Sequence, residues 1–518
     1  MLKVKHAPVR ARRWPAGYLR PRYGFWAPVG PAARPPMIFN SLTFLGFAAL
    51  FFPLYFALRG RARLWLCLAA SYVFYGAWRW EFLGLIALST CIDYFLGLSL
   101  ADEDDPTRRR RLLQLSLLAN LGFLAFFKYF NFFIESAVVG LRGIGYAGNL
   151  ETLNIILPVG ISFYTFQSMS YSIDVYRRQI PVERDFLRFA TFIAFFPQLV
   201  AGPIVRASDF LPQFAKDREF EWSRFQVGLG QVLWGFFKKV AIADSIAPFV
   251  DQVYTSPGSF GALHLLIGVV FYSFQIYCDF SGYSDIAIGL ARIMGFDFPK
   301  NFNKPYFSQN FSEFWQRWHI SLSGWLRDYL YIPLGGSRGS KWFTWRNLMI
   351  TMLLGGLWHG AAWVFVLWGA LHGGYQVVGR VLSPYWQRFW AATGVPRLQV
   401  PFNIAIVYAL TCFAWVYFRA GAPGIAMSEQ LPVAHEIIGG IFSTEGWSWG
   451  SVINKFLILK GVLLIAMMLV VELADEYQPV WQLVDARPAF RVASFAALTW
   501  IIALFGVFSA SAFIYFQF

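Results

Sequence analysis

The chain has 518 residues, of which 57% are hydrophobic and only 14% are charged, and its mean hydropathy is +0.47. Soluble globular domains carry about 25% charged residues, so this composition excludes a soluble protein and indicates an integral membrane protein. The formal net charge of +15 first suggests a nucleic-acid partner. Eight of the basic residues, however, lie in the first 36 positions, and the remaining +7 is spread over short loops that offer no basic domain for a duplex.

The first 36 residues are rich in Pro, Arg and Gly and show no helical periodicity. Met37 begins the segment Met-Ile-Phe-Asn-Ser directly before the first apolar run, and no signal-peptide core precedes it. We therefore expect residues 1–36 to be a disordered tail or the product of a mis-assigned start, with translation beginning at Met37. Residues 37–518 are expected to form a single membrane domain.

Apolar runs long enough to cross a bilayer recur from Ser41 to the end of the chain. Because lipid offers no partner for backbone amides, these runs must be helical, and the alternation typical of a transmembrane β-barrel is missing. The sequence thus predicts an all-α polytopic fold with about 12 spans. The candidate spans are 41–58, 64–78, 82–100, 112–133, 153–173, 186–201, 225–250, 262–295, 347–378, 401–418, 455–472 and 491–515. The two longest, 262–295 and 347–378, are long enough to bend or split.

Arginines in the first loops predict the orientation. Arg59, Arg61 and Arg63 follow the first candidate span, and four arginines at 108–111 follow the third. Basic loops stay on the cytoplasmic side, so both loops are expected there and the start of the first span faces outward. That orientation leaves the basic tail on the wrong side, which is a second reason to doubt residues 1–36.

The segment 299–331 is too polar to span a membrane but carries many aromatic residues. Placed on one helix from Phe311, its large apolar side chains fall on one face and its polar side chains on the other. The apolar stripe comprises Phe314, Trp315, Trp318, Leu322, Trp325, Leu326 and Tyr329. We expect an amphipathic helix that lies in the membrane interface or lines a re-entrant cavity, with Ile320 breaking the stripe and His319 at its boundary.

His359 is the most unusual of the six histidines. It lies well inside an apolar run, in the segment Gly-Gly-Leu-Trp-His-Gly at 355–360, where an ionisable group is costly and points to function. A neutral imidazole that bonds across a helix interface would also explain it. Histidine is nevertheless the most common general base, so His359 is our candidate catalytic residue. On a continuous helix His372 would face away from it, about 220° around the axis.

Other polar residues in apolar surroundings give weaker candidates. His319 lies 40 residues before His359, so only tertiary folding could join them, and an interfacial histidine is the simpler interpretation. Arg317, Arg327 and Asp328 could pair with one another or hold an anionic donor.

The segment 277–285 places Asp279 and Asp285 in an apolar neighbourhood. Together with Ser281 and Tyr283 they could line a cavity or a proton path, or these hydroxyls together with Ser284 could simply satisfy the carboxylates. The four cysteines are scattered singly, so no metal site is predicted.

Five segments, together with their order along the chain, resemble the membrane-bound O-acyltransferase family, in the branch typified by alginate O-acetyltransferase. They are FWQRWHISLSGWLRDYLY (314–331), LLGGLWHG (353–360), YCDFSGYSD (277–285), LPVGISFYTFQSMSYSIDVY (157–176) and FFPQLVAGPIVR (195–206). The ending FIYFQF (513–518) is also similar to this branch. The resemblance runs from Met37 to Phe518, and the tail before it is the one departure from the family pattern.

The resemblance implies specific roles. His359 corresponds to the catalytic histidine of the family's Trp-His-Gly motif, with Trp358 beside it, and His319 to a second functional histidine. The implied fold is a ring of helices around a central funnel or tunnel in a bacterial inner membrane. The implied donor is a cytoplasmic thioester such as acetyl-CoA, with extracytoplasmic acetyltransferase proteins as partners and a polysaccharide as final acceptor. No bound cofactor is implied.

Several functions remain open at this stage. Alginate is the leading acceptor, and cellulose, peptidoglycan and D-alanyl transfer to teichoic acid are alternatives. A transporter that uses Asp279 and Asp285 as a proton path is a candidate from another class, although no inverted repeat is evident among the spans.

Overall fold

The computed structural model describes residues 37–145, 152–153, 155–422, 424–443, 446–447, 455–477, 480–508 and 513–514. These residues form helices and connecting loops, and no β-strand occurs among them, which confirms the predicted all-α class. Residues 1–36, for which we expect a disordered tail or a mis-assigned start, lie outside the described residues.

The first third of the chain forms mainly long helices. These are α1 (Leu42–Ala57), α2 (Gly60–Arg79), η1 (Trp80–Phe82), α3 (Leu83–Asp102), α4 (Pro106–Leu124), η2 (Ala125–Tyr129), α5 (Phe130–Gly143) and α6 (Ile161–Tyr176). Asp105 caps the start of α4, because its carboxylate accepts hydrogen bonds from the amides of Thr107 and Arg108. The element η2 is a single π-helical turn between α4 and α5.

The middle of the chain alternates long helices with short ones. The short elements are α7 (Phe186–Ala194), α8 (Phe196–Leu199), α9 (Ala207–Phe210), η3 (Leu211–Ala215), η5 (Pro257–Ser259), η6 (Pro305–Phe307), α13 (Phe311–Arg317), α14 (Ile320–Leu326) and the π-helical turns η4 (Phe237–Ala243) and η7 (Arg327–Tyr331). The longer ones are α10 (Trp222–Phe236), α11 (Asp244–Thr255) and α12 (Ala262–Ile293).

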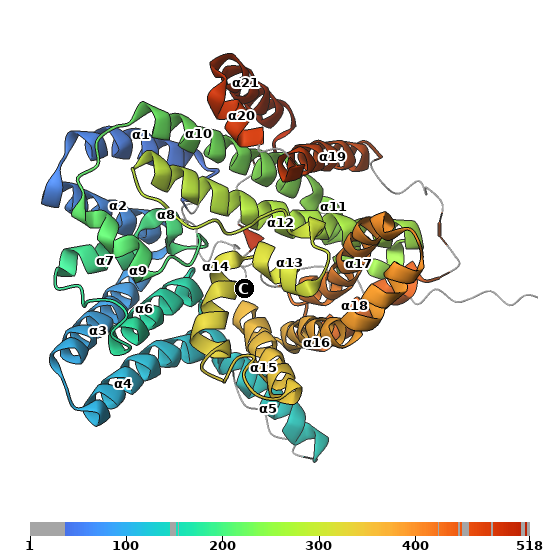
Figure 1. Cartoon of the computed structure of the whole chain (residues 1–518), viewed down its shortest axis with the longest axis horizontal. Coiled ribbons are helices and arrows are strands. Elements are labelled where there is room, and N and C mark those ends of the chain that lie inside the picture. The colour runs from blue at the N-terminus through green and yellow to red at the C-terminus, as the bar shows by residue number, and fades with distance from the viewer. Residues whose placement is uncertain are drawn as a thin grey trace, which may run out of the picture.

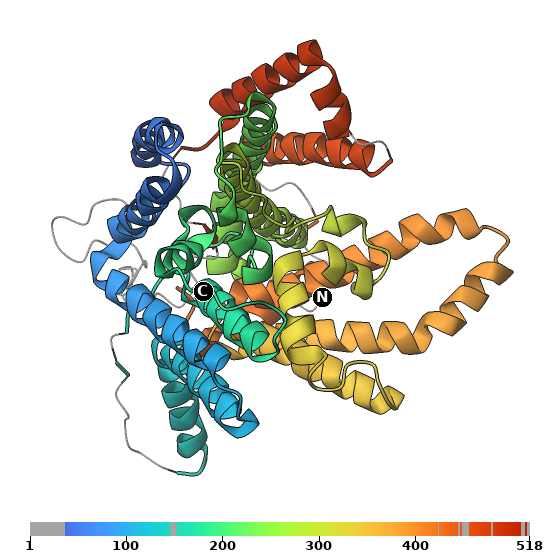
Figure 2. The same cartoon turned by 60° about the vertical axis from the view of Figure 1, so that its left-hand side comes forward.

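The last part of the chain again forms mainly long helices. These are α15 (Lys341–His359), α16 (Trp363–Ala392), η8 (Pro396–Leu398), α17 (Gln399–Ala420), α18 (Met427–Ile441), α19 (Lys455–Tyr477), α20 (Val480–Ala486) and α21 (Pro488–Phe505). In Figures 1 and 2 these helices and those of the first third surround α13 and α14, which lie near the middle of both views.

Six helical stretches in the described part are long and apolar enough to cross a membrane. They are Gly60–Asp102, Pro106–Gly143, Ala262–Ile293, Pro396–Ala420, Lys455–Glu476 and Pro488–Phe505. This is fewer than the predicted number of spans. The stretch Gly60–Asp102 contains two of the predicted spans, 64–78 and 82–100, and other predicted spans form helices that are too short or too polar. The run 186–201 forms two helices of 9 and 4 residues, and α1 has 16 residues.

The expected single amphipathic helix across 311–331 is wrong in one respect. The helix stops at Arg317, and His319 adopts the left-handed conformation (φ 43°, ψ 56°), so that α13 and α14 are separate helices. Non-glycine residues avoid this conformation unless their surroundings enforce it. The apolar stripe is nevertheless turned inward, since Phe314, Trp318 and Trp325 are all buried.

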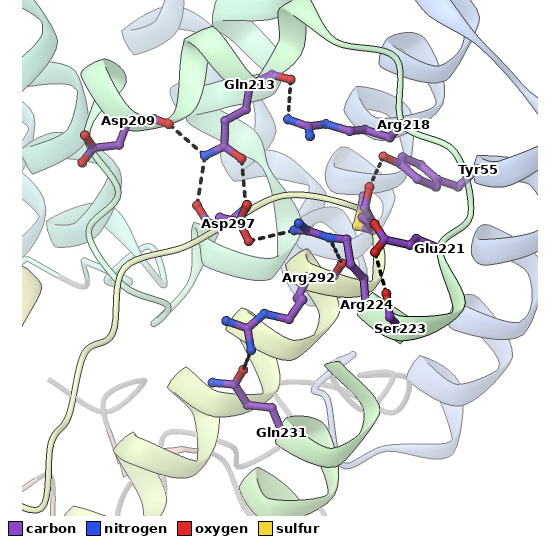
Figure 3. Close-up of polar contacts among 11 residues, drawn as sticks. Tyr55, Asp209, Gln213, Arg218, Glu221, Ser223, Arg224, Gln231, Arg292 and Asp297 are labelled. Carbon is purple, nitrogen blue, oxygen red and sulfur yellow. Dashed lines mark hydrogen bonds and ion pairs between the residues drawn. The ribbon is translucent and has the colours of Figure 1, made fainter. Parts of the chain in front are cut away.

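A network of polar contacts ties the loop after α9 to the segment that follows α12 (Figure 3). The side chain of Gln213 donates to the backbone oxygen of Asp297 (3.0 Å) and accepts from its amide (2.9 Å), and Arg224 binds the Asp297 carboxylate at 2.7 Å. These contacts fix the start of the loop that leads to Asn301. That loop in turn holds the break between α13 and α14.

Candidate active site

His359 is the last residue of α15, and its side chain is 2% exposed. Ser340 caps the start of the helix, because its hydroxyl accepts a hydrogen bond from the amide of Phe343. It ends because Gly360 is fully extended (φ −165°, ψ 153°), after which the chain turns into α16. The candidate span 347–378 is therefore split directly after the candidate catalytic histidine.

Trp358 joins the two candidate histidines. The centroid of its ring system lies 5.1 Å from that of His359 and 5.9 Å from that of His319. Phe163 and Phe166 of α6 contact the same indole at 5.3 and 5.5 Å. Residues 40 positions apart in sequence thus share one aromatic centre, which sequence periodicity alone could not show.

His319 is fully buried, and its strained backbone is braced by Asn301. The backbone oxygen of Asn301 accepts from the amide of Ile320 at 2.8 Å. Its side-chain Oδ1 accepts from the amide of Ser321 (3.2 Å) and from the Ser321 hydroxyl (2.8 Å). Asn301 therefore holds the turn between α13 and α14 from both its backbone and its side chain.

The same asparagine sets the orientation of the His319 ring. Nδ1 of His319 lies 3.1 Å from Oδ1 of Asn301, while Nδ2 of Asn301 donates to Ser284 at 3.0 Å. Because Oδ1 only accepts, Nδ1 of the histidine carries the proton, and Nε2 is the acceptor nitrogen of the neutral ring. Sequence analysis missed Asn301, since a single amide in a loop gives no periodic or charge signal.

The expectation that His372 faces away from His359 is wrong. That expectation assumed one continuous helix, but the two residues lie on α15 and α16, which pack against each other. Both rings contact Trp368, with centroid distances of 5.0 Å for His359 and 4.6 Å for His372. His372 is fully buried, and the rings of Phe314 and Trp315 also contact it.

Two cavities lie close to this centre. The first, which we call the histidine cavity, has a volume of about 20 Å³, room for about one water molecule. Its lining residues come from η2, the start of α6 and the end of α15: Lys128, Leu157, Pro158, Val159, Gly160, Ile161, Ser162, Phe163, Trp358 and His359. Gly160 is required here, because its φ is +77° and an added Cβ would lie 2.6 Å from the Leu199 oxygen.

The second cavity, which we call the basic cavity, has a volume of about 650 Å³. It is lined mainly by α13, α14, η7, α15 and α16, and its charged residues are Arg206, Asp209, Lys300, Arg327 and Arg380. Ile320 and Ser321, which follow His319, also line it, as does Met352 of α15. Met352 lies about 10 Å along the helix axis from His359 at 1.5 Å per residue.

Asp328 organises the charges at the basic cavity. Its carboxylate binds Arg206 at 2.6 Å and Arg327 at 2.7 Å. Burial raises the pKa of Asp328, but the hydrogen bonds from Arg327 and Arg206 lower it more, so the pKa lies below its ordinary value. Asp328 is therefore ionised at neutral pH and holds two guanidinium groups in place. The local pairing considered for Arg327 and Asp328 is present, and Arg327 also lines the cavity.

Arg317 occupies a different environment from Arg327. Its guanidinium pairs with Glu313 at 2.8 Å and with Glu476 of α19 at 2.9 Å, and it does not belong to the lining of either cavity. These contacts fasten α13 to the end of α19. A role for Arg317 in donor binding stays a prediction.

The acidic segment of α12 is buried and paired with lysines that sequence analysis did not consider. Asp279 is 2% exposed and binds Lys239 at 2.5 Å, while Lys238 binds Asp285 and the hydroxyl of Ser281. The alternative that serine and tyrosine hydroxyls satisfy these carboxylates is therefore wrong, because lysines bind both of them. Two lysines inside the apolar run 225–250 were the signal that could have found this pairing.

Tyr283 packs in the same interior region, on the ring of Phe39 at 4.7 Å. Asp279, Ser281 and Tyr283 line neither the histidine cavity nor the basic cavity. Their predicted part in substrate binding thus has no support in this geometry and stays a prediction. Among the described residues, no group of three or more His, Cys, Asp or Glu side chains could hold a metal ion.

Comparison with known proteins identifies the family of the chain. The model of the MBOAT family, membrane-bound O-acyltransferases, matches residues 108–418, which include both histidines. The chain belongs to the membrane-bound O-acyltransferase family. It is an O-acyltransferase, as the names of its relatives also indicate.

Three relatives show where this membrane-bound O-acyltransferase lies within the family. A protein of Azotobacter vinelandii named "Probable alginate O-acetylase AlgI" is 45% identical over 415 residues, which cover 80% of this chain and 79% of that protein. A protein of the same name from Pseudomonas aeruginosa is 44% identical over 415 residues, covering 79% and 76%. The peptidoglycan O-acetyltransferase of Helicobacter pylori is 37% identical over 448 residues, covering 80% and 81%.

Proposed function

We propose that this O-acyltransferase transfers an acetyl group from a thioester donor, such as acetyl-CoA, to a hydroxyl acceptor, with His359 as general base. The observation that carries the proposal is the position of the two cavities. The basic cavity reaches the residues next to His319, and the histidine cavity includes His359, while Trp358 contacts both rings. Donor and acceptor could thus approach one aromatic centre by different routes.

The charge of the basic cavity suits a phosphorylated donor. Four of its lining side chains are cationic and only Asp209 is acidic. Guanidinium groups bind phosphate oxygens in a bidentate manner, and Asp328 already holds Arg206 and Arg327 in position. In this proposal the phosphates lie at the arginines, and the thioester extends toward His319.

The reaction then needs two proton transfers, one from the acceptor hydroxyl and one to the leaving sulfur of the donor. His359 takes the proton from the acceptor hydroxyl as that oxygen attacks the thioester carbon, the C–O bond forms, and the C–S bond breaks. The proton returns to the leaving sulfur, which departs as a thiol. His319 would orient the donor or relay this proton. Holding both reactants in a desolvated site can supply about 7 to 11 kcal/mol of the barrier reduction.

We further propose that the donor arrives from the cytoplasm and that the protein lies in a bacterial inner membrane. Ion pairs join Arg61 to Asp185 (3.0 Å), Arg178 to Asp104 (3.2 Å) and Arg184 to Asp102 (2.7 Å), so several arginine-bearing loops lie near one another. Basic loops favour the cytoplasmic side. Arg177 also donates to the backbone oxygen of Asp328, which supports a cytoplasmic opening for the basic cavity.

The proposed final acceptor is an exopolysaccharide, with alginate as the leading polymer. The relatives named as alginate O-acetylases support this choice. The histidine cavity has room for about one water molecule, so only a slender hydroxyl-bearing group could enter it. Extracytoplasmic acetyltransferase proteins would then serve as partners that carry the acetyl group onward to the polymer.

The test is the acetyl content of the polymer in cells that carry His359→Ala or Asp279→Asn, with membrane expression quantified for both. We expect His359→Ala to abolish acetylation at normal expression. Asp279→Asn should reduce acetylation only in proportion to the amount of folded protein. Wild-type acetyl levels in the His359→Ala strain would overturn the proposal.

The same strains separate the alternatives. Loss of acetyl groups from peptidoglycan or cellulose, and not from alginate, would change the acceptor. Loss of D-alanyl esters would change the donor to an aminoacylated carrier. Loss of activity in Asp279→Asn at full expression, with His359→Ala active, would favour the transporter.

A further inference from the structure

Lys128 is a buried lysine inside a candidate membrane span. It lies in the π-helical turn η2, within the stretch Pro106–Gly143, and is 9% exposed. A lysine in such a place is costly, and it generally pairs with a carboxylate or with backbone carbonyls. The buried lysines Lys238 and Lys239 do pair with carboxylates. The hydrogen-bond partners of Lys128 are uncharged, and two of them are backbone oxygens at the end of α15.

Lys128 and the next residue, Tyr129, both donate hydrogen bonds to the C-terminal end of α15, the helix that carries His359. Nζ of Lys128 donates to the backbone oxygens of Trp358 (2.6 Å) and His359 (3.2 Å), and the Tyr129 hydroxyl donates to that of Leu357 (2.8 Å). The last four carbonyls of a helix have no partner within the helix, and they carry its partial negative charge. A cation with several donors therefore suits this position.

The end of α15 lacks the usual glycine cap. In that cap a left-handed glycine brings later amides back to the free carbonyls. Gly360 is extended instead, with φ at −165°. Side chains from η2 thus take over a function that the backbone would otherwise perform. Helix ends fray when nothing holds them, and here the last residue carries the candidate catalytic imidazole.

We propose that Lys128 is a positioning residue that fixes His359 by binding the terminal carbonyls of α15. This inference rests on the proposed function of His359 as general base. The π-helical turn η2 contributes to this positioning, because it brings the consecutive side chains of Lys128 and Tyr129 to the same end of α15. Ser162 of α6 completes the arrangement as a third partner of the ammonium group at 3.2 Å.

The test uses the full-length protein in membrane vesicles from cells that also make the proposed partner proteins and the polymer, with acetyl-CoA as donor, thiol release as the signal and the amount of folded protein quantified. Lys128→Met is expected to lower kcat about 10- to 100-fold, because small displacements of a catalytic group have effects of that size. The KM for acetyl-CoA should change by no more than about 2-fold, which corresponds to ~0.4 kcal/mol. The reason is that Lys128 does not line the basic cavity. A lysine that merely stabilised the fold would leave kcat per folded molecule unchanged.

Conservative variants and a matched control complete the design. Lys128→Arg and Lys128→Gln keep a donor and should retain more activity than Lys128→Met. Tyr129→Phe should lower kcat less than Lys128→Met, because it removes one hydrogen bond to α15 where Lys128 makes two. Lys341→Met removes an exposed lysine at the opposite end of α15 and should leave kcat and KM unchanged.

Two outcomes separate this inference from the proposed function. If Lys128→Met keeps the wild-type kcat while His359→Ala is inactive, the positioning role is overturned and the proposed function stands. If His359→Ala is itself active, the proposed function fails. Should Lys128→Met not fold, the double variant Lys128→Gln/Tyr129→Phe takes its place, because it replaces the ammonium by one amide and removes the phenolic hydroxyl. Wild-type kcat per folded molecule in that double variant overturns the positioning role.

Discussion

Asn301 accepts a hydrogen bond from Nδ1 of His319 at 3.1 Å, and its backbone oxygen accepts one from Ile320 at 2.8 Å. One residue thus holds both the ring and the left-handed backbone of the second candidate histidine. We predict that Asn301→Leu lowers kcat at least about 10-fold, because the ring loses its fixed tautomer and a buried polar group loses its partner, a cost of ~1–3 kcal/mol. Thiol release from acetyl-CoA measures this effect.

Asn301→Gln is the matched control for that variant. A glutamine is close in size to leucine and keeps an amide oxygen that can accept from Nδ1, without adding a buried charge. We expect this variant to retain more activity than Asn301→Leu. Equal activity of Asn301→Leu and the wild type would show that the orientation of His319 does not matter.

The sequence was sufficient for the all-α class of fold and for choosing His359 as a candidate, and insufficient for what holds the two candidate histidines in place. His359 stood out because an apolar run makes any imidazole costly. Asn301 did not stand out, because its effect depends on a loop that brings it next to His319, 18 positions further along the chain. The break at His319 had a weak signal in Ile320, which interrupts the apolar stripe, but periodicity cannot show a left-handed residue.

The placement of charges shows the same limit. Asp279 could be recognised as a buried carboxylate, but its partner Lys239 lies 40 positions earlier on another helix. Whether such a group is structural or functional depends on that partner. Similarly, the relation between His359 and His372 depended on whether 347–378 is one helix or two, and only the extended Gly360 decides this.

Arg327 lines the basic cavity with a side chain that is 66% exposed. We predict that Arg327→Ala raises the KM for acetyl-CoA about 5-fold, equivalent to ~1 kcal/mol for a solvent-exposed charge contact, and leaves kcat within about 2-fold. The effect should weaken as ionic strength rises, because salt screens exposed charges. Steady-state kinetics at low and high salt check both parts.

Arg338→Ala provides the control for the loss of one arginine. Arg338 is exposed in the loop between η7 and α15 and does not line the basic cavity. Its removal should leave the KM unchanged. If both variants raised the KM equally, the general surface charge, and not the cavity, would attract the donor.

Lys239 binds two carboxylates in the interior, Asp279 at 2.5 Å and Asp244 at 2.9 Å. We predict that Lys239→Met destabilises the protein by ~3–5 kcal/mol, because it leaves buried carboxylates without their cation. Activity per folded molecule should stay within about 2-fold, since this cluster lines neither cavity near the histidines. Melting temperature in detergent and thiol release measure the two quantities. A loss of activity at unchanged stability would give the Asp279 cluster a functional role.

Gly356 and Gly369 allow α15 and α16 to pack backbone to backbone. A Cβ added to Gly356 would lie 2.2 Å from the oxygen of Phe365, and one added to Gly369 would lie 2.3 Å from the oxygen of Met352. Neither backbone can yield without separating the helices. We therefore predict that Gly356→Ala costs ~1–3 kcal/mol of stability and lowers kcat as well, because His359 lies three residues further along the same helix.

Gly374→Ala tests whether close packing, and not the loss of a glycine as such, causes that effect. Gly374 also lies in α16, but a Cβ there meets no atom within 4 Å. Alanine favours helix over glycine by ~1 kcal/mol, so this variant should melt at the same temperature as the wild type or above it. If Gly356→Ala melted no lower than Gly374→Ala, α15 could move away from α16 without cost. The position of His359 would then depend more strongly on the contacts of Lys128 and Tyr129, and the effect of Lys128→Met on kcat should be correspondingly larger.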